Sequence, residues 1–311
     1  MLVSVIIPCY NVEAYIEECI ASVLSQSHSE TEIICVDNNS SDRTAAILDE
    51  QAAKHPGKVR VLQELKKGAS AARNKGLSAA AGAWIQFLDA DDLLLPEKIK
   101  HQLGIISGNS NITFVAAACI RQTVDGKQTT VTIRTKDPFK SLYTTKLGNT
   151  CANMFNAAQL KSIGGWNENI RSSQESDLMF RLLKNGAVIT DDNVPLTVIR
   201  ERASGQISQG DPKRNWMQYI ALRVEIIDYL KTNRKEYFEK EKDFYYQNLF
   251  SQVRTLAKYD LESAALVFKD NFEAGFTPSA GGGFSPYAVL FRVFGFRGAE
   301  RIKGMFSKLK P

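Results

Sequence analysis

The chain has 311 residues, 44% of them hydrophobic and 23% charged, which excludes wholesale disorder and allows one large domain with an extension. Its five cysteines contain no Cys-x-x-Cys pair, so we expect no disulfide framework and no zinc site, as is typical of the reducing cytoplasm. The net charge of +5 is concentrated after residue 284, where six lysines and arginines accompany one acidic residue; a nucleic-acid binder would spread this charge over its folded face.

The apolar segments are too short to cross a membrane. The first residues read Met-Leu-Val-Ser-Val-Ile-Ile-Pro, without the basic flank of a signal peptide, and Pro8 ends the apolar run. No stretch reaches the roughly 18 apolar residues of a spanning helix. We therefore expect neither a signal peptide nor a transmembrane helix, and a cytoplasmic location.

The first hundred residues alternate between strand and helix patterns. The β-branched run from Val3 to Ile7 predicts a strand buried on both faces, and Asn11 is suited to cap the helix that follows. Further strands are predicted at 32–36, 59–62 and 84–88, with helices starting at Ser41 and spanning 69–80. This alternation predicts the α/β class, with a doubly wound, mainly parallel sheet that binds ligands at the carboxyl ends of its strands.

The pattern changes after residue 110. Strands at 113–117 and 131–134 are predicted to flank a turn at Asp125-Gly126. A helix over 173–184 then precedes short strands at 187–189 and 196–199. From 212 to about 272 the sequence predicts helices, and Gly281–Gly283 forms a hinge. We expect a sheet domain at 1–210, a helical extension at 211–280 and a basic amphipathic tail at 281–311.

Three aspartates, Asp89, Asp91 and Asp92, follow the fourth predicted strand directly. An Asp-x-Asp triplet is common by chance, so its position at the ligand-binding edge of the sheet is what matters. Several acids on one turn repel one another unless a cation offsets them, and Mg²⁺ or Mn²⁺ accepts carboxylates together with diphosphate oxygens. The alternative is that Asp91 or Asp92 caps the helix beginning near Pro96.

Polar side chains also follow the first two strands. Asp37 can accept hydrogen bonds from a pyrimidine imide or from ribose hydroxyls, and Tyr10 can stack on a base. The alternatives are local turn chemistry for Asp37 and a half-buried packing role for Tyr10. The first turn is Pro8-Cys9-Tyr10-Asn11 rather than Gly-x-Gly-x-x-Gly, which disfavours a dinucleotide cofactor.

Two acids open the helix predicted at 173–184. Glu175 lies in the first turn and can act as a general base toward an acceptor hydroxyl. Asp177 and Arg181 are four residues apart, so an ordinary ion pair explains them equally well. The alternative for Glu175 is a simple helix-start acid.

Taken together, these segments resemble the family 2 glycosyltransferases, which have the GT-A fold. The matching segments are residues 4–11, 36–44, 67–74, 87–92 and 174–181. They occur in the family's order and spacing, and the resemblance covers about residues 1–205.

The resemblance implies a nucleotide-sugar donor, with UDP favoured, and single displacement with inversion at the sugar. The implied donor-binding residues are Pro8, Tyr10, Asn11, Glu13, Asp37, Gly68, Arg73, Asp89 and Ala90. Asp91 would bind the divalent metal, Mn²⁺ or Mg²⁺, and Glu175 would be the catalytic base, with Asp177 as the substitute. The family's later histidine is absent; Arg200 or Arg202 would neutralise the diphosphate instead. The implied acceptor is a glycan or lipid-linked saccharide, in bacterial surface polysaccharide synthesis.

The tail adds a separate prediction. Ile302, Met305, Phe306 and Leu309 have helical spacing among basic residues, as in a helix that lies on an anionic membrane surface at the inner face of the membrane. The alternative is that this stripe packs on the protein's own body.

Two other functions stay open. A sugar nucleotidyltransferase would use a related sheet but needs a Gly-rich basic loop after its first strand, which this chain lacks. A non-catalytic nucleotide-sugar or glycan-binding module would retain the fold without turnover.

Overall fold

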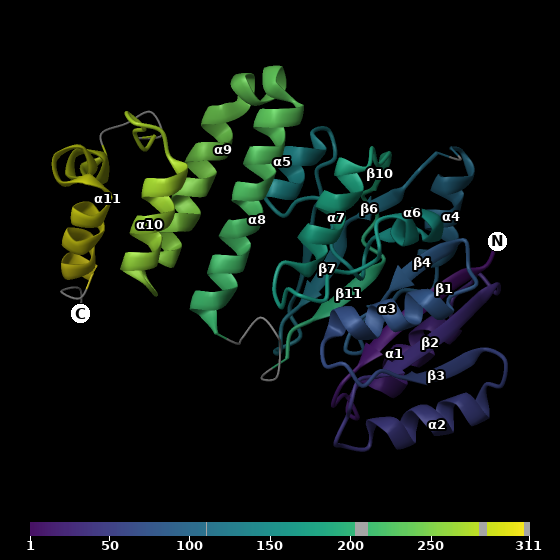
Figure 1. Cartoon of the computed structure of the whole chain (residues 1–311). Helices are drawn as coiled ribbons and strands as arrows, with labels where there is room; N and C mark the ends of the chain where they lie inside the picture. Colours follow the sequence, from purple (N-terminus) through teal and green to yellow (C-terminus); the bar gives the residue numbers. More distant parts are fainter. Residues whose placement is uncertain (110, 203–210, 280–284, 308–311) are drawn as a thin grey trace. The chain divides into compact units, whose positions relative to one another are not determined.

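The computed structural model describes residues 1–109, 111–202, 211–279 and 285–307. The chain divides into two compact units, residues 1–205 and 206–311 (Figure 1). Each unit has its own core, and the division into three parts expected from the sequence stays a prediction.

A seven-stranded sheet forms the centre of the first unit, in the order β10-β6-β9-β4-β1-β2-β3 (Figure 1). Its strands are β1 (Val3–Cys9), β2 (Thr31–Asp37), β3 (Val59–Gln63), β4 (Trp84–Phe87), β6 (Phe114–Ala117), β9 (Met154–Asn156) and β10 (Ile189–Asp192). β1 runs parallel to β2 and β4, β2 to β3, and β6 to β10, whereas β9 is antiparallel to β4 and β6. The predicted α/β class with a mainly parallel sheet is confirmed.

Helices cover both faces of this sheet. They are α1 (Ile16–Leu24), α2 (Thr44–Lys54), α3 (Ala69–Ala79), α4 (Lys98–Ser107), α5 (Pro138–Tyr143), α6 (Ala157–Ser162) and α7 (Gln174–Lys184). Val3, Val5 and Ile7 of β1 share one core cluster with residues of α1, α2 and α4. Ile6, on the opposite face, meets α3 so closely that a Cβ added at Gly76 would lie 2.4 Å from its Cγ2. The alternation of a strand thus explains the two helical layers.

A second, smaller sheet has the order β5-β11-β7-β8. Its strands are β5 (Leu93–Leu94), β7 (Cys119–Gln122), β8 (Gln128–Val131) and β11 (Thr197–Arg200). The turn at Asp125-Gly126 joins β7 to β8, with Cys119 paired to Val131, so the predicted hairpin between 113–117 and 131–134 is wrong. The fully buried β6 enters the main sheet instead, because its apolar residues need cover on both faces.

The second unit is helical. It contains α8 (Pro212–Asn233), α9 (Lys235–Leu256), α10 (Leu261–Asn271) and α11 (Pro286–Ser307). Phe250 of α9 lies within 5.2–6.1 Å, centroid to centroid, of aromatic rings in α10, in α11 and in the segment after α10. Such ring pairs stabilise the packing beyond the area they bury. No helix in the described ranges is long and apolar enough to cross a membrane.

Candidate active site

The carboxyl ends of β1, β2 and β4 meet at one edge of the main sheet. Cys9 of β1 is in register with Asp37 of β2, and Ile6 with Phe87 of β4. The segments that follow these strands therefore begin side by side. Tyr10 is 57% exposed there, while Asp37 is buried and accepts a hydrogen bond from the Ser40 amide at 3.3 Å. An exposed ring and a carboxylate at the same edge of the sheet are suited to a nucleoside.

Two of the predicted donor-binding residues hold the loops at this edge together. Asn11 adopts a positive φ of 49°, and its Oδ1 accepts from the Ser41 amide at 2.8 Å. The Glu13 carboxylate accepts from the Arg43 amide at 2.8 Å, at the start of α2. Asn11 therefore does not cap the first helix as expected, since α1 begins five residues later, at Ile16. Pro8 is half-buried at the end of β1.

Asn38 connects this edge to α3. Its Nδ2 donates to the carbonyl of Lys66 at 2.8 Å, and its Oδ1 accepts from the Gly68 amide at 2.7 Å. Gly68 has a φ of 134°, a conformation that side chains strongly disfavour. The loop before α3 is thereby fixed beside the candidate nucleotide site.

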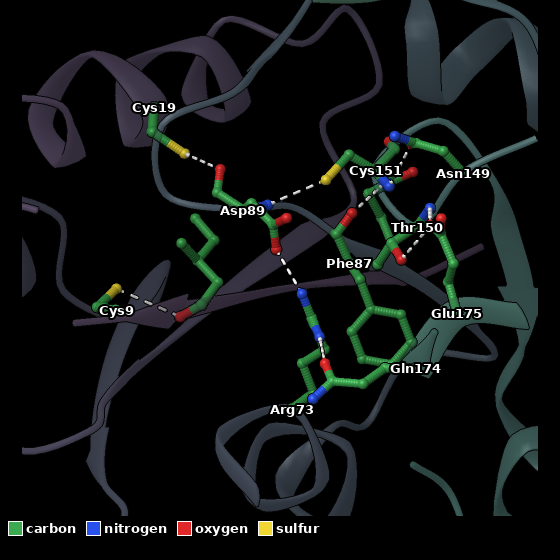
Figure 2. Close-up of polar contacts among 12 residues, drawn as sticks. Cys9, Cys19, Arg73, Phe87, Asp89, Asn149, Thr150, Cys151, Gln174 and Glu175 are labelled. Carbon is green, nitrogen blue, oxygen red and sulfur yellow. Dashed lines mark hydrogen bonds and ion pairs between the residues drawn. The ribbon is translucent and has the colours of Figure 1, made fainter. Parts of the chain in front are cut away.

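Arg73 of α3 links the acidic turn to the start of α7, as Figure 2 shows. Its Nη2 pairs with Asp89 Oδ1 at 2.7 Å, and its Nη1 donates to Gln174 Oε1 at 3.1 Å. Its guanidinium carbon lies 4.6 Å from the ring centroid of Trp166. Because the Arg73 side chain is 8% exposed and that of Asp89 is 40% exposed, Asp89 keeps a face toward solvent.

The aspartates of the acidic turn after β4 have different partners. Asp91 pairs with Arg202, whereas the buried Asp92 accepts from the Arg200 amide at 2.9 Å and does not cap α4. Burial, with the charges of Asp89 and Asp91, raises the pKa of Asp92 well above its usual value. Ala90 is buried beneath the turn.

The donor atoms at this turn fit a hard divalent ion. Ligand atoms of Asp89, Asp92 and Cys151 all lie within 4.8 Å of one another. Burial raises the pKa of the Cys151 thiol well above its usual value, so it stays protonated and offers a poor ligand to Mg²⁺ or Mn²⁺. A bound cation would favour the ionised form of Asp92, and hard ions prefer oxygen to sulfur, so the carboxylates of Asp89 and Asp92 are the natural ligands of this group. Asp91 is not part of the group, and its metal role stays a prediction.

Glu175 lies in the first turn of α7 and faces this site (Figure 2). Its Oε2 accepts from both the amide and the hydroxyl of Thr150, each at 3.0 Å. Within the described residues, Oε1 takes no hydrogen bond. Burial raises the pKa of Glu175, although the two bonds from Thr150 oppose this. A carboxylate with one free oxygen and a raised pKa is suited to act as a general base.

Asp177 has a structural partner instead. Its Oδ2 pairs with Arg181 at 2.7 Å, and Arg181 also donates to the carbonyls of Ile163 and Gly165, at 3.0 and 2.7 Å. Asp177 therefore orients an arginine that ties α7 to the segment after α6.

Three residues at this site were not found from the sequence: Trp166 under Arg73, Thr150 on Glu175, and Cys151, which accepts from the Asp89 amide at 3.2 Å. Each is distant in sequence from the residue it contacts, and no local pattern marks it.

This fold is that of GT-A-type glycosyltransferases. The chain belongs to glycosyl transferase family 2, whose model matches residues 4–161. Over 103 residues it is 46% identical to the putative teichuronic acid biosynthesis glycosyltransferase TuaG of Bacillus subtilis (strain 168), covering 33% of this chain and 40% of TuaG. The matched part spans 33% to 62% of the length of the first curated relatives.

Solved structures agree on the fold. The chain is similar to S. aureus TarS 1–349 in complex with UDP-GlcNAc, with a TM-score of 0.64 and 17% identity over 99% of this chain and 92% of that one. It is also similar to the mannosyltransferase PcManGT from Pyrobaculum calidifontis in complex with GDP-Man and Mn²⁺, with a TM-score of 0.54 and 18% identity over 98% and 87%.

Proposed function

We propose that this protein transfers a sugar from a nucleotide-sugar donor to a hydroxyl of a glycan or lipid-linked saccharide, with inversion and with a divalent metal ion. The observation that carries the proposal is the arrangement of Glu175. Its carboxylate is held by Thr150 and keeps one oxygen free, at the site where Arg73 fixes Asp89. The similarity to TuaG, a putative teichuronic acid biosynthesis glycosyltransferase, supports a role in surface polysaccharide synthesis.

Each residue has a defined task in this reaction. The residues that line the nucleoside are Pro8, Tyr10, Asn11, Glu13 and Asp37, and Gly68 and Arg73 border the nucleoside site. Asp89, with Ala90 next to it, holds the ribose or the sugar, and Asp91 would hold the metal. When bound, the metal acts as a Lewis acid toward the leaving diphosphate. Glu175 Oε1 takes the proton of the acceptor hydroxyl as its oxygen attacks the anomeric carbon. The bond from that carbon to the diphosphate oxygen breaks, and the nucleoside diphosphate leaves.

Calorimetric titration of UDP with Mn²⁺, and again with chelator, tests the donor site. We expect binding that requires the metal and is lost in Asp91→Ala, followed by transfer from a UDP-sugar with the anomeric configuration inverted, as read by NMR. Because PcManGT was solved with GDP-Man, GDP is titrated in parallel with dTDP. Failure of all three nucleotides refutes the donor assignment. Binding without transfer to any glycan acceptor favours a non-catalytic module.

We further propose that α11 contacts an anionic membrane surface. Phe291, Phe296 and Ala299 are buried, so one side of this helix packs on its own unit, whereas Val293 and Phe294 are 67% and 56% exposed. Gly295, with a φ of 64°, breaks the helix beside this pair, and the basic Arg292 and Arg297 flank it.

The apolar stripe expected at 302–309 is described only in part. Ile302 is half-buried and Met305 is 66% exposed, while the side chain of Phe306 and all of Leu309 lie outside the described residues. The outward apolar pair next to two arginines is therefore the stronger support for membrane contact.

Co-sedimentation with phosphatidylglycerol vesicles tests this contact. We expect the full chain to sediment with them, to stay soluble with phosphatidylcholine vesicles, and to lose binding in a Val293→Ser, Phe294→Ser variant. Equal binding of the variant, or no binding at all, refutes it. If the wild type were an oligomer and the variant a monomer, the exposed pair would instead be a contact between copies of the chain.

A further inference from the structure

Two arginines at the end of β11 contact the acidic turn after β4. Arg202 contacts the carboxylate of Asp91 through Nε and Oδ2, and the two side chains are 15% and 13% exposed. Arg200 donates its amide to Asp92 and contacts the Asp91 carbonyl through Nε. Arg202 is thus the arginine that holds the Asp91 carboxylate.

Tyr15, just before α1, supports both guanidinium groups. Its ring centroid lies 4.9 Å from the guanidinium carbon of Arg202 and 5.6 Å from that of Arg200. Attraction to the ring face stabilises a cation independently of its anionic partner. Arg202 can therefore exchange one anion for another while its head stays near the turn.

We infer that Arg202 competes with the metal ion for Asp91 and is released by the diphosphate of the donor. This inference rests on the proposed function, because it takes Asp91 as the metal ligand. The guanidinium occupies Oδ2, and it repels any cation brought to the same carboxylate. A divalent ion therefore binds Asp91 more weakly while Arg202 holds Oδ2.

A diphosphate gives Arg202 a new partner. A guanidinium binds phosphate oxygens through two parallel hydrogen bonds, whereas the described contact with Asp91 runs through Nε alone. Nucleotide binding would draw Arg202 from Asp91 and strengthen metal binding there. By thermodynamic linkage, the metal must strengthen nucleotide binding by the same factor.

Mn²⁺ binding measured by electron paramagnetic resonance, without nucleotide, tests the competition in the full chain. We expect Arg202→Gln to bind Mn²⁺ about tenfold more tightly or better, from the usual worth of a charge-assisted hydrogen bond. If the glutamine variant folds poorly, Arg202→Met replaces it in the same measurement, since methionine is also a long, unbranched side chain without charge. Adding UDP should strengthen Mn²⁺ binding in the wild type by a larger factor than in either variant.

Arg121→Gln is the matched control, because it removes one positive charge from β7, where Arg121 is the register partner of Ile199 in β11. If Arg121→Gln and Arg202→Gln strengthened Mn²⁺ binding equally, the cause would be the loss of one positive charge anywhere near the site, and the inference would be overturned. Unchanged or weaker Mn²⁺ binding in both Arg202 variants also overturns it. The comparison of Mn²⁺ affinities between the wild type and the variants needs no nucleotide. A wild type that binds no UDP, GDP or dTDP would reject the proposed function and the release of Arg202 by a diphosphate, while the Mn²⁺ comparison would still decide whether Arg202 competes with the metal for Asp91.

Discussion

Lys98, in the first turn of α4, is a charged residue enclosed by the core of the first unit. It is 1% exposed, and its Nζ makes no hydrogen bond within the described residues. Burial lowers the pKa of Lys98 to about 7, although Asp192 and Cys151 act in the opposite direction. The carboxylate of the buried Asp192 has other hydrogen-bond partners, His101 Nε2 and Gln102 Nε2, each at 3.0 Å. Replacing Lys98 with methionine therefore leaves Asp192 with hydrogen bonds and should stabilise the unit.

The size of the effect follows from the pKa. The unfolded chain holds the lysine proton up to a pKa of about 10.4, so between pH 7 and pH 10 it binds more protons than the folded chain. Folded stability must then rise with pH. Taking a folded pKa of about 7, Lys98 costs about 4 kcal/mol at pH 7 and about 2 kcal/mol at pH 9. Lys98→Met should gain these amounts, with the larger gain at pH 7.

Denaturant unfolding followed by tryptophan fluorescence measures this difference. Trp84 and Trp166 are buried in the first unit, so a Trp216→Phe background reports on that unit alone. Lys100→Met is the control, because Lys100 lies on the same helix but its side chain is 65% exposed. Its unfolding free energy should change by less than about 0.5 kcal/mol. A Lys98→Met protein that is no more stable than the wild type, or a gain independent of pH, would refute the reasoning.

The catalytic assignments give four further expectations. Glu175→Gln should lower kcat about 100-fold or more while UDP affinity, measured by calorimetry, is unchanged; a small loss of kcat would exclude it as the base. The base must be ionised, so activity should fall as pH drops through a pKa raised above the usual glutamate value. Thr150→Val removes a hydroxyl that lowers this pKa, so the acid limb of kcat should move to higher pH, and an unmoved limb would contradict the assignment. Asp177→Asn should lower the free energy of unfolding by about 1–3 kcal/mol, because it weakens the bond to Arg181, and should leave kcat unchanged. A large loss of kcat with unchanged stability would make Asp177 the base.

Local patterns predicted the elements that bury apolar residues most completely. β1 is apolar on both faces, and its four residues in register with β4 are all buried, so the sequence was sufficient to place it in the sheet. β7 was missed because Cys119–Gln122 is half-exposed and carries two polar residues. Its pairing with β11 joins segments far apart in the chain, which no local period reveals.

The candidate site shows the same limit. The residue types at the strand ends identified Asp37 and Asp89 as polar groups at the ligand-binding edge, and the structure brings both there. Their partners depend on tertiary contacts. The ion pair of Asp177 with Arg181 could be expected from their spacing, but the contacts of Arg181 with the carbonyls of Ile163 and Gly165 could not.

The acidic turn is electrically balanced before any ligand arrives. Arg73 pairs with Asp89, Arg202 pairs with Asp91, and burial favours the protonated form of Asp92. A diphosphate brought to this turn adds negative charge, which a metal ion and the release of Arg202 would both offset. Uridine adds none. We therefore expect uridine to bind with an affinity that is independent of Mn²⁺ and unchanged in Arg202→Gln, whereas UDP affinity depends on both. Calorimetry with the two ligands checks this, and Mn²⁺-dependent binding of uridine would mean that the metal organises the nucleoside pocket rather than the diphosphate site.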